Sequence, residues 1–414
     1  MNNKSIPHLI IVGGGASGLV ASIMAAKIGM CITLLEQNSQ IGKKIRISGN
    51  GKCNITNKNI VSERFHSCHR GFIEAVLQDY RFDTVKTFFT SIGLELVEGK
   101  EGKMFPMSLQ ASSVAELLEY EAKKSGVNLI YNCRVDAVCK KNNIFILETT
   151  QGIHKCEKLL LASGSPAAPQ LGGNDSGLHF AKQMGHTIIP NLPSLVQLCS
   201  KESWIKHASG VKCEGIAKLY ANREYITEKK GDLLFTAYGI SGLAILDLSR
   251  EASLYLAQHA HCELILDLIP KLNKEKLTAL LLGRIHKGSQ KPLNLWLQGI
   301  MNKKLIPIIL EQSKCKAIYE YELDRKEIGK LVFALKNLRL SISDTKGFKG
   351  AEVAVGGIDT TEVNPQTMES KRVKNLYFAG EILDVDADRG GFNFHFAWVS
   401  AMRAGKALKS TNIF

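Results

Sequence analysis

Glycines at positions 13, 15 and 18 stand between two short apolar runs, and no other feature constrains the fold of this chain as much. The run HLIIVG has the composition of a buried parallel strand, and the small and apolar residues from Ala16 to Lys27 predict a helix packed closely on a sheet. The run MCITLLE predicts a second strand that ends at Glu36. Strand, glycine turn, helix and strand therefore follow one another from Leu9 to Glu36.

The three glycines have separate roles in such a unit. Gly13 permits the tight turn, Gly15 lets the backbone approach a pyrophosphate, and Gly18 lets the helix lie close to the strand. The helix N-terminus then offers free N–H groups and a positive dipole end to the phosphates. Glu36 can accept hydrogen bonds from ribose hydroxyls, and its charge repels a 2′-phosphate. This stretch predicts a bound dinucleotide, FAD or NAD rather than NADP.

Two further segments favour FAD over NAD. The residues from Gln37 to Asn57, QNSQIGKKIRISGNGKCNITN, predict a glycine-rich basic loop of the kind that contacts the ribityl chain of an extended FAD. Near the other end, a strand over Asn375–Ala379 precedes Glu381, an acid that can hold ribityl hydroxyls. A helix led by Gly390 and Gly391 can point its positive end at the flavin, where it stabilises the negative charge of the reduced ring.

These stretches resemble the BaiN/RdsA-like family of FAD-dependent oxidoreductases, also called the YhiN-like flavoproteins. The similar segments run along the whole chain and include IVGGGASGLVASIMAA, ISGNGKCNITN and FAGEILDVD with the following GGFN. The resemblance implies an α/β fold, in which a two-dinucleotide-binding-type FAD domain (Rossmann-like ββα) is interrupted by an inserted domain. The chain reads GNGKCN and ASGS where the family more often reads GGGRCN and ATGG. The identity of the substrate can therefore be inferred from the family less readily than that of the cofactor.

Carried over position by position, the resemblance places the pyrophosphate and adenosine against the first glycine turn, Glu36 and the backbone of Val135. The flavin side is placed between the loop after Glu36, the turn LLLASG and the C-terminal glycine pair. The expected cofactor contacts are Gly13, Gly15, Ala16, Ser17, Gly18, Glu36, Lys44, Gly51, Cys53, Asn54, Val135, Ala162, Ser163, Gly164, Gly380, Glu381, Gly391, Phe392 and Asn393.

The two halves of this site lie far apart in the sequence, so the FAD-binding domain is expected to be discontinuous. After Pro190 the pattern changes to short strands with turns between them. We expect the FAD-binding domain to comprise residues 1–190 and 344–414, and a strand-rich inserted domain to comprise residues 191–343. Within the insert, strands are expected over 191–269 and 316–343, and a small helical lobe over 270–315, where Leu and Ile recur at helical spacing.

Flavin chemistry asks the protein mainly for orientation and electrostatics, so its catalytic signature in a sequence is weak. A proton donor would assist the reduction of an enone-like bond. Cys53 has no second cysteine nearby, which favours packing over redox chemistry. No second glycine fingerprint occurs, so NADH or NADPH is expected as a transient electron donor. The candidate proton donors are His395 and Asp384, then Asp386, Tyr238 and Trp398, and for His395 packing is the stronger interpretation.

Composition indicates an ordinary globular protein. The chain has 414 residues, of which 45% are hydrophobic, and no apolar run is long enough to span a bilayer. No secretory signal pattern is visible, so we expect a cytoplasmic protein. Ten cysteines without a C-x-x-C pair predict no disulfide framework. The cluster FHSCH, with His66, Cys68 and His69, is interpreted as a polar loop, and no metal is expected.

The net charge of +14 could attract nucleic acid, anionic lipid or anionic cofactors, but the lysines are scattered along the chain. A nucleic-acid partner is therefore disfavoured without being excluded. The leading hypothesis is an FAD-dependent oxidoreductase that is reduced by NAD(P)H and passes hydride to a small organic substrate. Two alternatives stay open. One is an RNA-associated flavoprotein or FAD-dependent tRNA-modifying factor, and the other is a flavin-binding protein with sensing or partner-binding duties and negligible turnover. The sequence leaves the substrate and the oligomeric state open.

Overall fold

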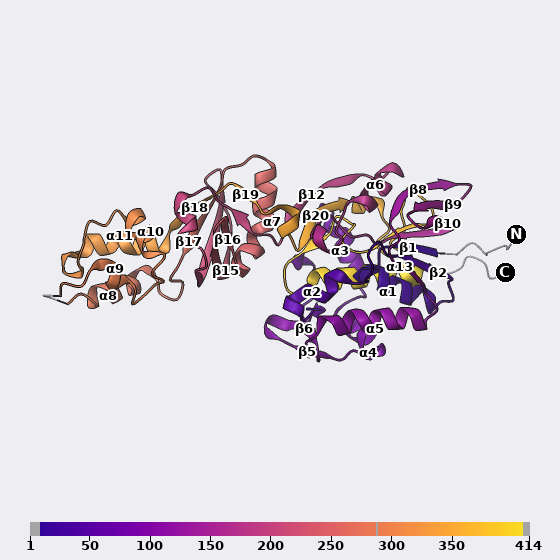
Figure 1. Cartoon of the computed structure of the whole chain (residues 1–414), viewed down its shortest axis with the longest axis horizontal. Helices are drawn as coiled ribbons and strands as arrows, with labels where there is room; N and C mark the ends of the chain where they lie inside the picture. The colour runs from indigo at the N-terminus through magenta and orange to yellow at the C-terminus, as the bar shows by residue number, and fades with distance from the viewer. Residues whose placement is uncertain (1–8, 287–288, 409–414) are drawn as a thin grey trace. The chain divides into compact units, whose positions relative to one another are not determined.

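The computed structural model describes residues 9–286 and 289–408, which divide into two compact units (Figure 1). The first unit runs up to residue 191 and resumes at residue 353, and the second comprises residues 192–352. The α/β class and the interrupted dinucleotide-binding domain expected from the sequence are confirmed. Among the described residues, no helix combines the length and the apolar composition that crossing a bilayer requires.

A five-stranded parallel sheet forms the centre of the first unit, in the order β21-β11-β1-β2-β7. Every residue of β1, β2 and β11 is buried, which explains their continuous apolar composition. Helices α1 (Ala16–Ala26) and α13 (Phe392–Ala407) pack against each other beside this sheet. A Cβ on Gly405 would lie only 2.5 Å from Cβ of Met24, so the helices touch where α13 has no side chain. The strands are β1 (Leu9–Val12), β2 (Ile32–Leu35), β7 (Asn128–Ile130), β11 (Lys158–Leu161) and β21 (Leu376–Phe378).

Smaller elements surround this core. Three antiparallel strands form the sheet β10-β9-β8, and the remaining short strands pair as β3-β6-β5, β22-β4 and β12-β20. Those strands are β3 (Thr56–Asn57), β4 (Phe65–His66), β5 (Leu96–Glu98), β6 (Lys103–Pro106), β8 (Val135–Lys141), β9 (Ile144–Thr149), β10 (Gly152–Cys156), β12 (Ile188–Ser194), β20 (Val353–Ile358) and β22 (Asp386–Ala387). The other helices are α2 (Lys43–Gly51), α3 (Arg70–Leu77), α4 (Phe82–Ser91), α5 (Ala111–Lys124) and α6 (Ser176–Gln183), with 3-10 turns η1 (Ser62–Arg64), η2 (Lys100–Gly102), η3 (Pro169–Leu171) and η6 (Thr360–Glu362).

The second unit contains an antiparallel seven-stranded sheet in the order β18-β17-β14-β15-β16-β13-β19. Helix α7 packs on this sheet, and α8 to α11 form a helical lobe whose apolar residues join the same core. The strands are β13 (Leu198–Cys199), β14 (Lys212–Ala221), β15 (Glu224–Thr236), β16 (Gly239–Ser241), β17 (Cys262–Asp267), β18 (Leu338–Ile342) and β19 (Asp344–Thr345). The helices are α7 (Leu243–Ala257), α8 (Lys274–Gly283), α9 (Leu293–Leu297), α10 (Ile306–Ser313), α11 (Arg325–Lys336) and α12 (Gly347–Gly350), with 3-10 turns η4 (Ser203–Lys206) and η5 (Glu320–Glu322).

The expectation of a strand-rich segment over 316–343 is wrong, because α11 occupies much of that segment and β18 is its one named strand. Asp324 caps α11 by accepting the N–H of Glu327, and Ile328, Leu331 and Leu335 supply its buried stripe. The helical lobe thus extends past the expected residue 315.

The second junction lies at Glu352–Val353 rather than after Ser343. The reason is that the chain after β18 stays with the inserted sheet. Strand β19 pairs with β13, and the N–H of Lys346 donates to the carbonyl oxygen of Gln197.

Candidate functional site

The turn between β1 and α1 packs tightly against neighbouring backbone at Gly13 and Gly18 and has free space at Gly15. A Cβ on Gly13 would lie 2.6 Å from the carbonyl oxygen of Ala162, and one on Gly18 would lie 1.9 Å from the carbonyl oxygen of Gly13. Gly15, by contrast, has no atom within 4 Å of its Cβ position, and no side chain caps the helix that it begins. The first helical N–H groups of α1, from Ala16 and Ser17, are therefore free to bind an anion.

Glu36 lies beside this turn at the end of β2 and is buried. Its Oε2 accepts the N–H of Gly14 at 2.8 Å, and its Oε1 accepts the backbone N–H and the side-chain amide of Asn38 at 2.8 and 2.6 Å. The carboxylate is thus oriented at the turn, in the place where a ribose-binding acid is expected.

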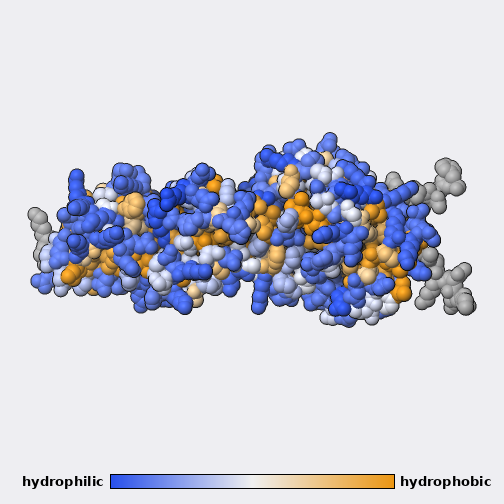
Figure 2. Space-filling model, turned by 90° about the horizontal axis from the view of Figure 1, so that it is seen from above, coloured by the Kyte–Doolittle hydropathy of each residue, from blue (hydrophilic) through white to orange (hydrophobic). Residues whose placement is uncertain are grey.

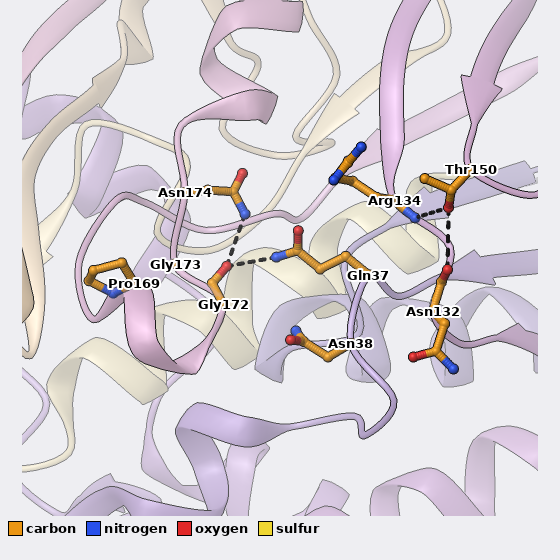
Figure 3. A pocket seen from close by; sticks show the side chains of 9 residues that line it. All are labelled: Gln37, Asn38, Asn132, Arg134, Thr150, Pro169, Gly172, Gly173 and Asn174. Atoms are coloured by element: carbon orange, nitrogen blue, oxygen red, sulfur yellow. Dashed lines mark hydrogen bonds between the residues drawn. The ribbon is translucent and has the colours of Figure 1, made fainter.

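Beyond Glu36 lies a polar hollow of about 450 Å³. Figure 3 shows Gln37 and Asn174 reaching the carbonyl oxygen of Gly172 from two sides, at 2.7 and 2.9 Å. On the opposite wall the N–H of Arg134 donates to Thr150 Oγ1 at 3.1 Å, and Val135 follows at the start of β8. The lining residues are Gln37, Asn38, Asn132, Arg134, Thr150, Pro169, Gly172, Gly173 and Asn174.

The segment expected as a polar loop after Glu36 contains a helix, α2, which begins at Lys43. Ile45 is completely buried, and this anchors the helix. The helical geometry breaks at Ser48, and Gly49 and Asn50 adopt positive φ angles of 57° and 55°. Gly51 has a φ of 80° and faces open space. The loop expected from the glycines is therefore confined to the end of this segment.

Cys53 and Asn54 follow that turn. Burial raises the pKa of the Cys53 thiol to about 12, although a hydrogen bond with Ser48 acts in the opposite direction. The thiol is therefore not a ready thiolate, as its packing role predicts. Asn54 Oδ1 is buried and has no hydrogen-bond partner, so it is available to a ligand donor.

The turn after β11 lies against the β1–α1 turn, because a Cβ on Gly13 would lie 2.6 Å from the carbonyl oxygen of Ala162. The N–H of Ala162 donates to the carbonyl oxygen of Val12, and Gly164 faces open space. The Ser163 hydroxyl, however, points toward α6, since it lies 2.0 Å from the Cβ position of Gly177. Only the backbone of Ser163 is thus left to serve as a contact.

Glu381 connects four segments that are distant in the sequence. Its Oε2 lies 3.0 Å from Lys44 Nζ, and its Oε1 accepts Ser165 Oγ at 2.8 Å and the N–H of Ala354 at 3.1 Å. Gly380 must be a glycine there, because its φ is 78° and a Cβ would lie 2.5 Å from Ser17 Oγ. Ser165 was not among the expected site residues, and its position two residues after Ser163 was the only signal for it.

The N-terminus of α13 meets the Asn54–Asn57 loop. Gly391, with a φ of 97°, precedes the helix, and a Cβ on it would lie 2.6 Å from the carbonyl oxygen of Thr56 and 2.9 Å from Asn54 Oδ1. Asn57 Nδ2 donates to the carbonyl oxygen of Gly390 at 3.0 Å. The loop and the glycine pair are therefore brought together as the sequence predicts.

At two other expected contacts near this end, the side chain already contacts another part of the protein. Phe392 is buried edge-on against Phe65, with ring centroids 5.8 Å apart. Asn393 holds the preceding loop by bonding the backbone N–H and carbonyl oxygen of Ala387 at 2.9 and 2.7 Å. Only the backbone N–H groups of these two residues are left for a ligand.

His395 and Asp384 have structural partners. His395 is completely buried, with Nδ1 2.8 Å from Thr56 Oγ1 and Nε2 3.1 Å from the carbonyl oxygen of Tyr80. Because a carbonyl only accepts, Nε2 carries the hydrogen, and burial lowers the pKa of this imidazole to about 4. Asp384 accepts the N–H of Cys68 at 2.9 Å. Neither group is placed to give a proton to a substrate.

The remaining candidate proton donors are not free side chains of this site either. Trp398 Nε1 donates to the carbonyl oxygen of Ile55, Asp386 is buried, and Tyr238 belongs to the second unit. His66 of the FHSCH cluster pairs with Asp388 at 2.9 Å. Within residues 9–286 and 289–408, no three His, Cys, Asp or Glu side chains are placed to hold a metal ion.

Comparison with known proteins decides the family. Residues 7–407 match the model described as the HI0933-like protein Rossmann domain. The chain belongs to the HI0933-like family. The resemblance noted in the sequence is confirmed, and so is the enzyme class: this HI0933-like protein is an FAD-dependent oxidoreductase.

Two curated relatives of the HI0933-like protein span nearly its full length. A 3-dehydro-bile acid delta(4,6)-reductase from Clostridium scindens is 35% identical over 96% of this chain and 98% of its own. A ribosomal RNA dihydrouridine synthase from Haemophilus influenzae is 30% identical over 95% of this chain and 96% of its own. Among solved structures, a 3-ketosteroid delta1-dehydrogenase from Sterolibacterium denitrificans has a TM-score of 0.54 at 10% identity, covering 98% of this chain and 100% of that one. That likeness concerns the fold alone.

Proposed function

We propose that the HI0933-like protein holds FAD between the β1–α1 turn and the start of α13 and uses it to reduce a carbon–carbon double bond conjugated to a carbonyl group. The observation that carries the proposal is the pair of helix N-termini that begin at Gly15 and Gly391. One is uncapped and open beside the oriented carboxylate of Glu36, and the other adjoins the unpartnered Asn54 oxygen. An extended dinucleotide with an anionic centre and a polar ring at its far end fits both.

At the adenosine end, the N–H groups of Ala16 and Ser17 would bind the pyrophosphate, and the α1 dipole would favour its charge. Glu36 would accept the ribose hydroxyls. The polar hollow beyond it would receive the adenine, against the backbone of Val135. Gln37 and Arg134, which were not expected from the sequence, line that hollow.

At the flavin end, Glu381 would hold ribityl hydroxyls while Lys44 balances its charge. Bound FAD supplies the hydride-transfer chemistry. The backbone N–H groups at the start of α13, from Phe392 and Asn393, would stabilise negative charge at the adjoining edge of the ring. Asn54 Oδ1 would accept a hydrogen bond from a ring N–H, which would satisfy its missing partner.

We further propose that NADH or NADPH supplies the electrons by docking transiently. Glu36 lies at the resident dinucleotide and so does not select between the two donors. The substrate is proposed to be a small organic enone. Support comes from the relative named as a 3-dehydro-bile acid delta(4,6)-reductase, whose name describes hydrogen added to double bonds conjugated to a ketone.

A second candidate substrate is RNA. The relative named as a ribosomal RNA dihydrouridine synthase also saturates a double bond conjugated to a carbonyl, in a uracil ring. The net charge of +14 would favour a polyanion. The same flavin chemistry would serve both substrates. The two candidates therefore differ in whether the protein surface binds a small molecule or RNA.

The decisive experiment starts from the purified protein and its visible spectrum. We expect a bound flavin that is bleached by NADH or NADPH without oxygen and is then reoxidised by a 3-oxo-4-ene steroid. Reoxidation by a protein-free ribosomal RNA transcript, with no response to the steroid, would favour the second candidate. A colourless protein that takes up no added FAD would refute both.

A further inference from the structure

The helical lobe of the second unit carries most of the excess positive charge of the chain. Residues 271–336 contain fourteen Lys and Arg against six Asp and Glu, which leaves eight of the fourteen net charges in this segment. In Figure 2 hydrophilic residues cover much of the lobe, seen at the left, with apolar residues set among them. The charge that looks scattered in the sequence is therefore concentrated in one part of the fold.

The acidic side chains around η5 are either buried or accept hydrogen bonds from nearby backbone N–H groups. Glu320 is completely buried. Glu322 accepts the N–H groups of Ile318 and Tyr319 at 2.6 and 3.3 Å, and Asp324 caps α11 by accepting the N–H of Glu327 at 2.7 Å. Glu322 and Asp324 thus stabilise the local backbone, although both side chains stay exposed.

The basic side chains of the same segment are exposed. Lys314, Lys316, Arg325 and Lys326 all face solvent, and none has an ion pair within the part of the chain that the structure describes. Lys316 lies beside the start of α11, because Glu327 accepts its N–H at 3.0 Å. Lys314 lies beside the same helix, because its carbonyl oxygen accepts Lys330 Nζ at 3.4 Å. These four cations thus lie between the end of α10 and the first turn of α11.

Two tyrosines stand between these cations in the sequence and stack on each other. The rings of Tyr319 and Tyr321 are 5.7 Å apart with an interplanar angle of 11°. Tyr321 is 49% exposed and Ile318 is 66% exposed, so one ring of the stack is open to a further partner. Cations interleaved with exposed aromatic rings are typical of proteins that bind single-stranded nucleic acid.

We propose that this face, formed by Lys314, Lys316, Tyr319, Tyr321, Arg325 and Lys326, binds single-stranded RNA. The four cations contact phosphates, and an unpaired base extends the tyrosine stack. RNA is the fitting partner because its loops and bulges present unstacked bases, whereas cellular DNA is mostly duplex. The proposal goes beyond the flavin chemistry and does not depend on it, since the face lies in the second unit and the expected FAD contacts lie in the first.

The test measures fluorescence anisotropy of the full-length protein with a labelled 20-nucleotide unstructured RNA. Four phosphate contacts predict a slope of log K against log salt of about −3. Tyr321→Ala is expected to weaken binding between roughly 5- and 150-fold, as the loss of one stacked base predicts. The double variant K316E/K326E is expected to weaken binding further and to lower the slope by about half.

Matched controls stand on the same unit outside the lobe. Tyr225 is 53% exposed, and Lys201 and Lys206 are exposed, so Y225A and K201E/K206E repeat the same chemical changes elsewhere. Equal losses in lobe and control variants would overturn the proposal. So would single-strand binding that Tyr321→Ala leaves unchanged, or duplex RNA of the same sequence bound as tightly as the single strand. Tighter, lobe-dependent binding to phosphatidylserine vesicles than to RNA would assign the face to a membrane surface instead.

Discussion

Gly15→Val separates the cofactor site from the fold more cleanly than any other substitution. Gly15 has φ −81° and ψ −165°, an extended conformation open to every residue, and no protein atom lies within 4 Å of its Cβ position. The valine side chain would therefore enter only the space proposed for the pyrophosphate. The apoprotein should keep its stability to within about 0.5 kcal/mol, as for other surface substitutions without clashes.

The effect on FAD can be estimated from the hydrogen bonds that the side chain would block. A bond from a backbone N–H to a charged group contributes about 1.5–3 kcal/mol, so the loss of two such bonds costs about 3–6 kcal/mol. The Kd for FAD should then rise between roughly 10²- and 10⁴-fold. The measurements are the flavin-to-protein absorbance ratio after gel filtration, and the quenching of FAD fluorescence when apoprotein is titrated.

Two comparison variants make the result interpretable. Gly283 also has no atom within 4 Å of its Cβ position, but it lies in α8, so Gly283→Val should retain FAD fully. Gly18→Val should fail to fold, because its Cβ would lie 1.9 Å from the carbonyl oxygen of Gly13. If Gly15→Val purified with full FAD occupancy and an unchanged Kd, the placement of the pyrophosphate at this turn would be refuted.

Three further predictions concern buried groups in the first unit. Cys53→Ala should leave flavin reduction by NADH unchanged in stopped-flow absorbance, because burial raises the pKa of the thiol to about 12. If the variant lost or slowed that reduction, Cys53 would have a redox role after all. His395 is neutral in the fold, because burial lowers its pKa from 6.5 to about 4. The free energy of unfolding is therefore full above pH 6.5 and falls on acidification, by about 2 kcal/mol at pH 5. Urea unfolding of His395→Gln should lack this fall. Burial opposes ionisation of Glu362, but bonds from Arg372 and Thr187 outweigh it and lower its pKa from 4.5 to about 2. Its stabilisation is present above pH 4.5 and is lost toward pH 2, so Glu362→Gln should cost up to about 3 kcal/mol at pH 7 and unfold with a flatter acid dependence below pH 4.5.

The secondary structure that could be predicted from the sequence is the part that short-range rules decide. Leu9–Val12 is a fully buried parallel strand, and its continuous apolar run is enough to predict this. The same rules failed at α11, where a stripe of Ile and Leu at helical spacing was interpreted as strand. The capping residue Asp324 was the local signal that favours the helix.

What the sequence alone determined is therefore the dinucleotide turn, with Glu36 at its end, because a tight turn, a close backbone approach and an uncapped helix depend on neighbours a few residues apart. The tertiary structure decided which polar groups are still available. For His395 the sequence favoured packing over proton donation, and the fold supplies the partners of its ring nitrogens, Thr56 Oγ1 and the carbonyl oxygen of Tyr80. Glu381 acquired Lys44 and Ser165 as partners from segments far away in the chain. A buried polar group must find a partner, and for these residues the partner comes from elements that only the folded chain brings together.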